Sequence, residues 1–175
     1  PHVAGVAALV KEYLVKHHPE LTPEQVSETV KALIMSTAKP HVNKETGAYT
    51  SPRQQGAGVV DTAAAVSTDL YVTGENNYPS VTLGNVGDSF TFDVTIHNIS
   101  DTDRTLKMLV NTDTDEVKDG KFTLRPRKLT ETAWPEVTVK AHSSETVTVK
   151  VDTSKFTEEL SKEMPNGYFL EGFVR

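Results

Sequence analysis

The sequence predicts a mixed fold, with helices in the first part of the chain and an antiparallel β-sandwich in the remainder. Apolar residues recur at helical spacing as far as about Val66. From about Leu70 onward, apolar and polar residues alternate in short runs separated by turn residues, a pattern typical of a sandwich. The chain has 175 residues, 37% hydrophobic and 24% charged, which is enough for a partial domain joined to a small complete one.

Residues 1–18 predict a buried helix. The first ten are apolar on nearly every face, and a helix of that kind belongs in the core of a larger protein. Pro1 suits the first helical turn, and His17-His18-Pro19 is expected to end the helix. No initiator Met, charged leader or cleavage site accompanies the apolar run, so we do not interpret it as a signal peptide. We expect a piece of a longer protein that opens inside this helix and closes inside a strand.

A second helix is expected from Thr22 to about Ala38. Thr22 is a suitable N-cap, Pro23 occupies the first helical position, and Gln25 lies where a capping box requires it. Apolar residues then recur at helical spacing until Pro40 follows the predicted end.

A polar loop is expected after the second helix, as far as about Gln55. Gly56-Ala57-Gly58 permits a tight or strained backbone, and Val59-Val60 is expected to return to the core. Asp61 can cap a short Ala-rich helix that runs through Val66.

The second part of the chain predicts strands with polar turns between them. Strict alternation indicates strands at residues 90–97, 137–139 and 146–151. Turn residues occur at 98–103, 119–120 and 142–144. Residues 156–163 predict a short helical turn, and 168–175 predict a further strand. We therefore expect a small sandwich that is incomplete at its last strand.

Composition excludes several classes of function. The net charge of -6 argues against a nucleic-acid partner, because binding phosphates requires clustered Lys and Arg. No apolar run approaches the roughly 20 residues of a membrane span, so no membrane insertion is expected. The chain has no cysteine, which excludes a disulfide framework and thiolate metal ligands.

Three segments resemble one family of enzymes. Pro1-His2-Val3-Ala4-Gly5 resembles the residues that follow the nucleophilic serine in subtilisin-like serine proteases. The segment from Ser51 to Asp61 is similar to the one that closes the catalytic domain of cell-envelope subtilisins. The segment from Asn166 to Val174 is similar to a strand of the fibronectin type III-like domain that follows. Together they point to the cell-envelope proteinase group, which includes lactocepin-like and streptococcal complement-inactivating peptidase-like enzymes.

The resemblance implies a division of the chain and a function for its parent. Residues 1–68 would be the C-terminal end of a subtilisin-like α/β peptidase domain, and residues 69–175 a fibronectin type III-like β-sandwich. The parent would hydrolyse peptide bonds in extracellular proteins with an Asp-His-Ser triad that lies upstream of Pro1. It would be secreted and anchored to the wall of a Gram-positive bacterium. Its partners would be protein substrates and the rest of the protease domain in cis, without a cofactor. The chain alone is expected to be inactive.

The histidines and polar clusters of the sequence are not predicted to be functional sites. His2 follows the nucleophile motif, but the family pattern makes it a packing residue. His17 and His18 diverge on a helix and are expected at a solvated helix end. Asn111 to Asp115 alternates like a calcium loop, yet Glu116 stands where the loop needs Gly and Phe122 where it needs Glu. We expect an exposed polar strand end or turn there.

The remaining candidates also favour structural roles. Ser143-Ser144 fits a solvated sheet face, and Glu158-Glu159 point apart on a helix. Trp134 is expected to pack over a sandwich edge rather than to form a binding platform. Asn98-Ile99-Ser100 matches the glycosylation pattern, which would be idle in a bacterial protein. No residue is assigned to catalysis, to a cofactor or to a metal. The alternative function is a β-sandwich binding or adhesion module that carries a helical remnant.

Overall fold

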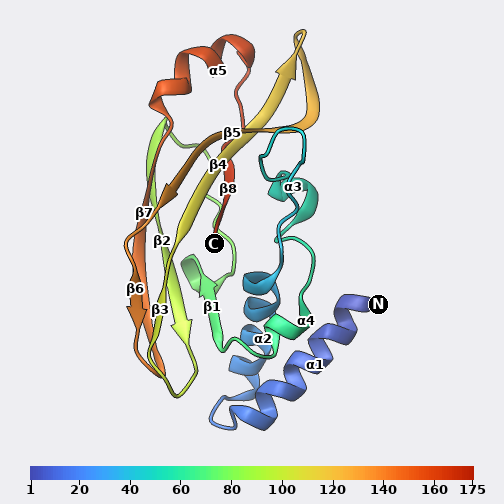
Figure 1. Ribbon diagram of the computed structural model, residues 1–175, viewed down its shortest axis with the longest axis vertical. Coiled ribbons are helices and arrows are strands. Elements are labelled where there is room, and N and C mark those ends of the chain that lie inside the picture. Colours follow the sequence, from blue (N-terminus) through green and yellow to red (C-terminus); the bar gives the residue numbers. More distant parts are fainter.

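The computed structural model describes all residues from 1 to 175 and contains a helical unit packed against a β-sandwich (Figure 1). The helical unit holds α1 (His2–His17), α2 (Pro23–Thr37), α3 (Pro52–Gln55) and α4 (Thr62–Ala65). The sandwich holds eight strands, two 3-10 turns and one further helix, α5 (Thr157–Glu163). In Figure 1 the helices α1, α2 and α4 lie beside the lower part of the sandwich, and α5 covers its upper end.

The helices begin where their capping residues predict. The Thr22 hydroxyl accepts a hydrogen bond from the Gln25 backbone N–H, and the Gln25 side-chain oxygen accepts one from the Thr22 backbone N–H, so the predicted capping box of α2 is confirmed. Asp61 accepts a hydrogen bond from Ala64 and caps α4, which confirms the short helix.

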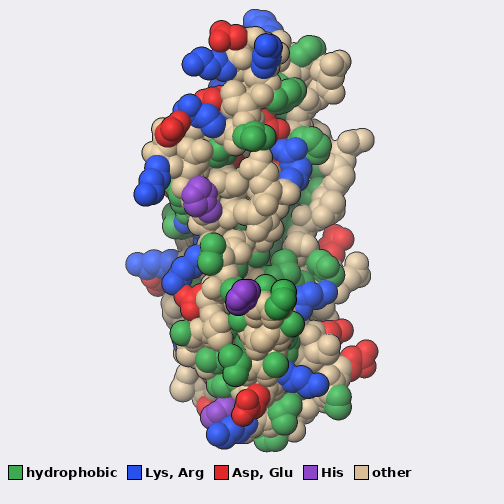
Figure 2. All heavy atoms as spheres, turned by 90° about the vertical axis from the view of Figure 1, so that its right-hand side faces the viewer, with side chains coloured by type: hydrophobic (Ala, Val, Ile, Leu, Met, Phe, Trp, Pro, Cys, Tyr) green, Lys and Arg blue, Asp and Glu red, His purple; other side chains and the backbone are tan.

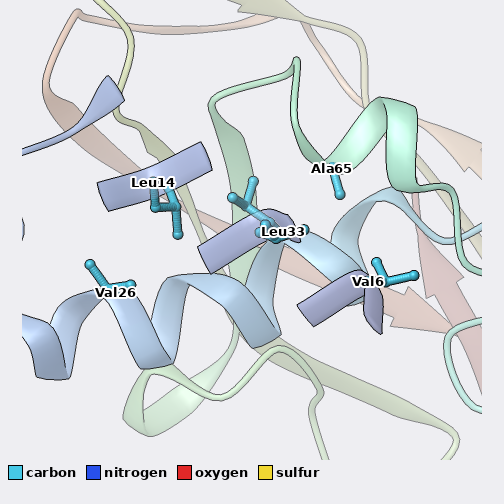
Figure 3. Close-up of a cluster of buried hydrophobic side chains, with 6 residues drawn as sticks. Val6, Leu14, Val26, Leu33 and Ala65 are labelled. Carbon is cyan, nitrogen blue, oxygen red and sulfur yellow. The ribbon is translucent and has the colours of Figure 1, made fainter. Parts of the chain in front are cut away.

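One small core joins the helices to one another. Figure 3 shows the side chains of α1, α2 and α4 pointing toward one another. Its fully buried members are apolar and come from all three helices: Val6, Val10, Leu14, Val26, Leu33 and Ala65. Tyr71 and Ile99 from the sandwich pack against the same cluster, so the two units share a contact through it.

The N-terminal half of α1 is less covered than its sequence predicts. Val3 is 58% and Leu9 53% exposed, and Ala4, Gly5 and Ala8 between them are exposed as well. We call these five residues the exposed apolar half of α1. In Figure 2 hydrophobic side chains appear over the lower part of the molecule, the part that holds the helices in Figure 1. Only the face with Val6, Val10 and Leu14 is buried, because α2 and α4 cover that face alone.

The predicted return of Val59-Val60 to the core is half wrong. Val60 packs against the helical core, but Val59 is 68% exposed. Val59 forms an antiparallel bridge with Lys39, and successive side chains of an extended segment point to opposite sides. Gly56 and Gly58 have φ values of 64° and 124°, which agrees with the predicted tight backbone.

Two three-stranded antiparallel sheets form the sandwich. The first has the order β1-β2-β7 and contains β1 (Leu70–Thr73), β2 (Ser89–Asn98) and β7 (Ser143–Asp152). The second has the order β5-β4-β8 and contains β4 (Leu109–Lys118), β5 (Lys121–Ala133) and β8 (Glu171–Val174). A two-stranded pair, β3 (Arg104–Leu106) with β6 (Val137–Val139), completes the β structure. The 3-10 turns are η1 (Glu75–Asn77) and η2 (Ser154–Phe156).

The sandwich core lies between these two sheets. Its buried members come from both layers: Val94, Val149 and Val151 on one side, and Met108 and Val110 on the other. Trp134 is half-buried and packs against this cluster, so it has the packing role expected of it. A smaller cluster of Leu129, Leu160 and Met164 fixes α5 to β5.

The last predicted strand is shorter than expected. Residues 168–175 predict a strand, but β8 includes only Glu171–Val174 and pairs with β4 from Val110 to Asp113. The Thr114 hydroxyl donates to the Phe169 carbonyl oxygen at 2.7 Å, so a side chain takes the acceptor that a longer ladder would use. The register of β4 is also irregular beyond Asp115, where strand pairing is interrupted.

Candidate functional site at the junction of helices and sandwich

Charged and aromatic residues from distant parts of the chain meet where the helices contact the sandwich. Three clusters hold this junction, around Asp69, around Arg53 and around Asn111 with Asp113. His18, Asn111 and Asp113 are buried polar residues of this junction.

Asp69 ties the end of α1 to the start of the sandwich. The Tyr13 hydroxyl donates to Asp69 Oδ1 at 2.6 Å, and His18 Nε2 lies 3.0 Å from the same oxygen. Burial, with the Asp69 hydrogen bond and charge added, raises the pKa of Tyr13 to about 12. Asp69 itself has a φ of 51°, which marks a sharp change of chain direction directly before β1.

The expectation of a solvated His18 is therefore wrong. Only 7% of His18 is exposed, whereas His17 is exposed as expected. The sequence shows two adjacent histidines before a proline, and nothing local distinguishes them. The carboxylate that contacts His18 belongs to Asp69, which lies 51 residues further along the chain.

Arg53, at the start of α3, is held by two carboxylates of the sandwich. Its Nη2 donates to both oxygens of Asp115, at 3.1 and 2.9 Å, and its Nε donates to Glu171 Oε1. The Ser51 hydroxyl donates to the other oxygen of Glu171. The guanidinium also lies 4.0 Å above the centre of the Phe169 ring. One cation thus connects α3, β4, β8 and the loop before β8.

The polar segment from Asn111 to Asp115 is buried along most of its length, which corrects the exposed turn expected there. Asn111 is 2% and Asp113 5% exposed, and both lie in β4, the middle strand of its sheet. The alternate residues of β4 face the sandwich interior, where Val110 joins the core. The other face meets the helical unit, where the Tyr49 ring packs against Phe173 at 5.5 Å.

Two buried oxygens of this segment have no hydrogen-bond partner: Asn111 Oδ1 and Asp113 Oδ1. The other Asp113 oxygen accepts a hydrogen bond from the Asn111 amide at 2.7 Å. Burial raises the pKa of Asp113 to about 6 and Glu131 adds to the effect, while the nearby Tyr49 backbone N–H, the Asn111 amide and the Lys128 charge oppose it. The carboxyl group is therefore poised to ionise below neutral pH.

A hydroxyl–imidazole pair on the sandwich has the first two groups of a hydrolytic triad. Ser144 Oγ lies 2.9 Å from His97 Nδ1, and Thr73 Oγ1 lies 2.8 Å from Nε2. No carboxylate contacts the ring, and burial lowers the pKa of His97. The ring also stacks on Tyr71 at 4.6 Å. Without a carboxylate to stabilise an imidazolium, this pair lacks the chemistry of a triad. Its hydrogen bonds join β1, β2 and β7.

The other sequence candidates remain apart. His2 is exposed at the start of α1, and Glu158-Glu159 lie on α5 at the far end of the sandwich. Asn98 is 1% exposed, and its amide donates to the carbonyl oxygens of Thr102, Val139 and Lys140. No group of three His, Cys, Asp or Glu side chains is placed to hold a metal ion. None of the helices has the length and apolarity that crossing a membrane requires.

Sequence reasoning did not identify Arg53, Glu171 or Asp69 as junction residues. Arg53 lies in the segment that carries the family resemblance, but its two partners are 62 and 118 residues away. Nothing in the local pattern connects them.

Comparison with known proteins supplies the family context. Residues 81–175 match the family model described as an Fn3-like domain. The chain is 43% identical over 176 residues to a C5a peptidase of Streptococcus pyogenes serotype M6, with 100% of this chain and 15% of the relative covered. It is 31% identical over 189 residues to a PI-type proteinase of Lactococcus lactis subsp. cremoris, with 99% of this chain and 10% of the relative covered. The chain therefore spans about a seventh or less of the length of these relatives.

A solved structure also shows a weak likeness. The β-glucosidase of Listeria innocua in complex with gluconolactone aligns with 50% of this chain and 11% of its own, at 21% identity and a TM-score of 0.34.

Proposed function

The chain belongs to the Fn3-like domain family, and from its similarity to cell-envelope proteases we propose that it is part of a cell-envelope subtilisin-like serine endopeptidase. Residues 1–68 are the C-terminal end of the peptidase domain, and residues 69–175 are its first accessory sandwich. The observation that carries this proposal is the continuous similarity to a C5a peptidase, which extends over both the helical unit and the sandwich. An isolated sandwich relative would match the second part alone.

The exposed apolar half of α1 supports a position inside a larger domain. Its buried face packs on α2 and α4, while Val3, Leu9 and the small residues between them face outward. The remaining part of the peptidase domain covers these residues in cis. By the family pattern, the nucleophilic serine would lie four positions before Pro1, close to the start of α1, where free backbone N–H groups can stabilise a developing oxyanion.

The sandwich holds a fixed position beside the peptidase domain. The Asp69 cluster and the Arg53 cluster bind it at two separated places, so it cannot turn freely about the linker. Such an arrangement lets an accessory domain shape the approach of large protein substrates to a neighbouring active site.

The relatives support protein substrates for the parent enzyme. A C5a peptidase and a PI-type proteinase both act on peptide bonds, and the substrates proposed for the parent enzyme are extracellular proteins. The parent is secreted and anchored to a Gram-positive cell wall. Its hydrolysis proceeds through an acyl-enzyme and requires no cofactor.

Active-site labelling tests this proposal. The chain of 175 residues should not react with diisopropyl fluorophosphate and should not cleave casein, because it contains no nucleophile activated by a base. A polypeptide extended upstream to include the whole peptidase domain should do both. Labelling of the short chain, or codons before Pro1 that encode no Gly-Thr-Ser-Met-Ala segment, would contradict the proposal and favour a binding module.

A further inference from the structure

Residues 41–50 form a loop that closes on itself and lies against the sandwich; we call it the Tyr49 loop. The Thr50 backbone N–H donates to the His41 carbonyl oxygen at 3.0 Å, and Val42 forms an antiparallel bridge with Tyr49. In Figure 1 the chain between α2 and α3, which contains this loop, lies beside β8. Because its backbone hydrogen bonds are internal, the loop can move away from the sandwich without breaking a strand ladder.

Aromatic contacts and a surface ion pair connect the Tyr49 loop to the sandwich. The Tyr49 ring packs against Phe173 at 5.5 Å, and the Arg175 guanidinium lies 4.5 Å from the centre of the same ring. Glu45 forms an ion pair with Arg125 at 2.9 Å, but both side chains are exposed, and exposed pairs contribute little to stability. The position of the loop is therefore sensitive to the charge of a group that it covers.

Asp113 is the titratable group beneath the loop. It is 5% exposed, and the Tyr49 backbone N–H lies near its carboxyl group. One of its carboxyl oxygens is buried without a hydrogen-bond partner. Such a site opposes ionisation, because a buried charge is costly unless it is paired and hydrogen-bonded.

The charged groups around Asp113 are already paired with one another. They are Arg53 in α3, Asp115 in β4, Lys128 and Glu131 in β5, Glu171 in β8 and Arg175 directly after β8. Asp113 forms no ion pair, and Glu171 lies directly opposite it in the ladder of β4 and β8. Like charges in opposite positions destabilise a sheet. An ionised Asp113 is therefore a buried anion without a cation of its own.

We propose that the contact between the Tyr49 loop and the sandwich is a pH-sensitive switch controlled by Asp113. While the carboxyl group is neutral, the loop covers it and Tyr49 packs against Phe173. When the carboxyl group loses its proton, the charge requires water, and the population in which the loop has moved away from β4 and β8 rises. Burial raises the pKa of Asp113 to about 6, which places the change in mildly acidic solution. Arg53 keeps both its carboxylate partners, so α3 stays in position.

Hydrogen exchange of the Tyr49 amide, followed by NMR on the chain of 175 residues, measures this opening. Asp113 binds its proton with a pKa of about 6 under the loop and with the ordinary value of 3.8 once it is exposed. The equilibrium constant for opening therefore rises with pH between these two values and becomes constant above them. After correction for the intrinsic exchange rate, the protection factor of the Tyr49 amide should fall roughly tenfold from pH 5 to pH 7.

Urea distinguishes movement of the loop from unfolding of the whole chain. Moving the loop exposes little surface, so protection of the Tyr49 amide should hardly depend on low concentrations of urea. Amides in the ladder of β2 and β7 exchange when the sandwich unfolds, so their protection should fall steeply as urea is added.

Two carboxylate variants assign the pH dependence. Asp113→Asn cannot ionise, so its Tyr49 protection factor should change less than about twofold between pH 5 and pH 7. Asp101→Asn removes a 95% exposed carboxylate and is the matched control, which should keep the tenfold fall.

Equal pH dependence of Tyr49 protection in the unsubstituted chain and in Asp113→Asn would overturn the proposed switch. So would Tyr49 protection that depends on urea as steeply as the ladder of β2 and β7 does at every pH. If Asp113→Asn does not fold, the unsubstituted chain decides the outcome: a fall of less than about twofold from pH 5 to pH 7 contradicts the switch. None of these results bears on the peptidase proposal, which active-site labelling tests separately.

Discussion

At the scale of single residues, Asp113 is where burial and charge are most directly opposed. Its carboxyl group is 5% exposed, and its pKa is raised to about 6 from the ordinary 3.8. The folded chain therefore binds this proton more tightly than the unfolded chain does. The stability that this group contributes is complete below about pH 3.8, declines as the pH rises through this interval, and is lost above about pH 6.

Asp113→Asn should remove this pH dependence. Asparagine keeps an acceptor for the Asn111 amide but cannot ionise, so at pH 7 the variant should be more stable than the parent by up to about 3 kcal/mol. At pH 4 the two free energies of unfolding should agree within about 0.5 kcal/mol. Urea unfolding from pH 4 to pH 8 measures both values. Asp101→Asn, at a 95% exposed side chain, is the control and should follow the parent. If the free energies of unfolding of Asp113→Asn and of the unsubstituted chain change with pH in parallel, the pKa of Asp113 is not raised by folding.

Gly172 is constrained by contact rather than by conformation. A Cβ at this position would collide with the backbone carbonyl oxygen of Asn111 on the paired strand. Backbone cannot move aside without breaking the pairing of β4 with β8. Gly172→Ala should therefore lower the free energy of unfolding by about 1 to 3 kcal/mol.

A second glycine provides the comparison. Gly5 lies inside α1 with open space around it, so Gly5→Ala should stabilise the chain by about 1 kcal/mol through helix propensity. Thermal unfolding of both variants tests the pair. Equal effects would indicate that the close approach of Gly172 to Asn111 does not exist in solution.

At the scale of elements, Arg53 fixes the position of α3 against β4 and β8. Removing its charge leaves Asp115 and Glu171 as two neighbouring carboxylates without a cation. Arg53→Gln should lower the free energy of unfolding by about 1 to 3 kcal/mol and speed amide hydrogen exchange in β8. Arg53→Lys should recover only part of the loss, because an ammonium cannot reproduce the guanidinium geometry or its stacking on Phe169.

Arg127 offers a matched control for this prediction. It forms ion pairs with Glu159 and Glu163, which lie on α5 and not in the helical unit. Arg127→Gln should therefore leave exchange in β8 unchanged. Equal exchange in the Arg53 and Arg127 variants would show that Arg53 does not hold the junction.

Local patterns predicted the elements well where each depends on its own residues. The capping box of α2 follows from Thr22 and Gln25, and the hairpin turn at Asp119-Gly120 follows from residues that tolerate positive φ. Patterns failed where a distant segment decides burial. The residues near His18 do not indicate that it contacts Asp69. The polar residues of β4 do not indicate that the helical unit covers Asn111 and Asp113. The junction was invisible for the same reason, because its partners are far apart in sequence.

At the scale of the whole molecule, the helical unit is the less complete part. Its buried core has six residues, and the exposed apolar half of α1 lies outside it. Under the proposed function this surface belongs inside a larger domain. Exposed apolar side chains favour association between chains, because burying a Val or Leu side chain stabilises the associated state by about 1.5 to 3 kcal/mol.

The chain of 175 residues should therefore associate through α1 as its concentration rises. Sedimentation velocity should show a dimer or larger species, and Val3→Glu with Leu9→Glu should return the chain to a monomer without loss of helix. Val15→Glu is the matched control: Val15 is 58% exposed but lies in the other half of α1, so association should persist. A polypeptide that includes the complete peptidase domain should remain monomeric without any substitution, because the domain itself covers Val3 and Leu9. An unsubstituted chain of 175 residues that is monomeric at all concentrations and binds no apolar dye would contradict the idea that α1 needs a covering partner.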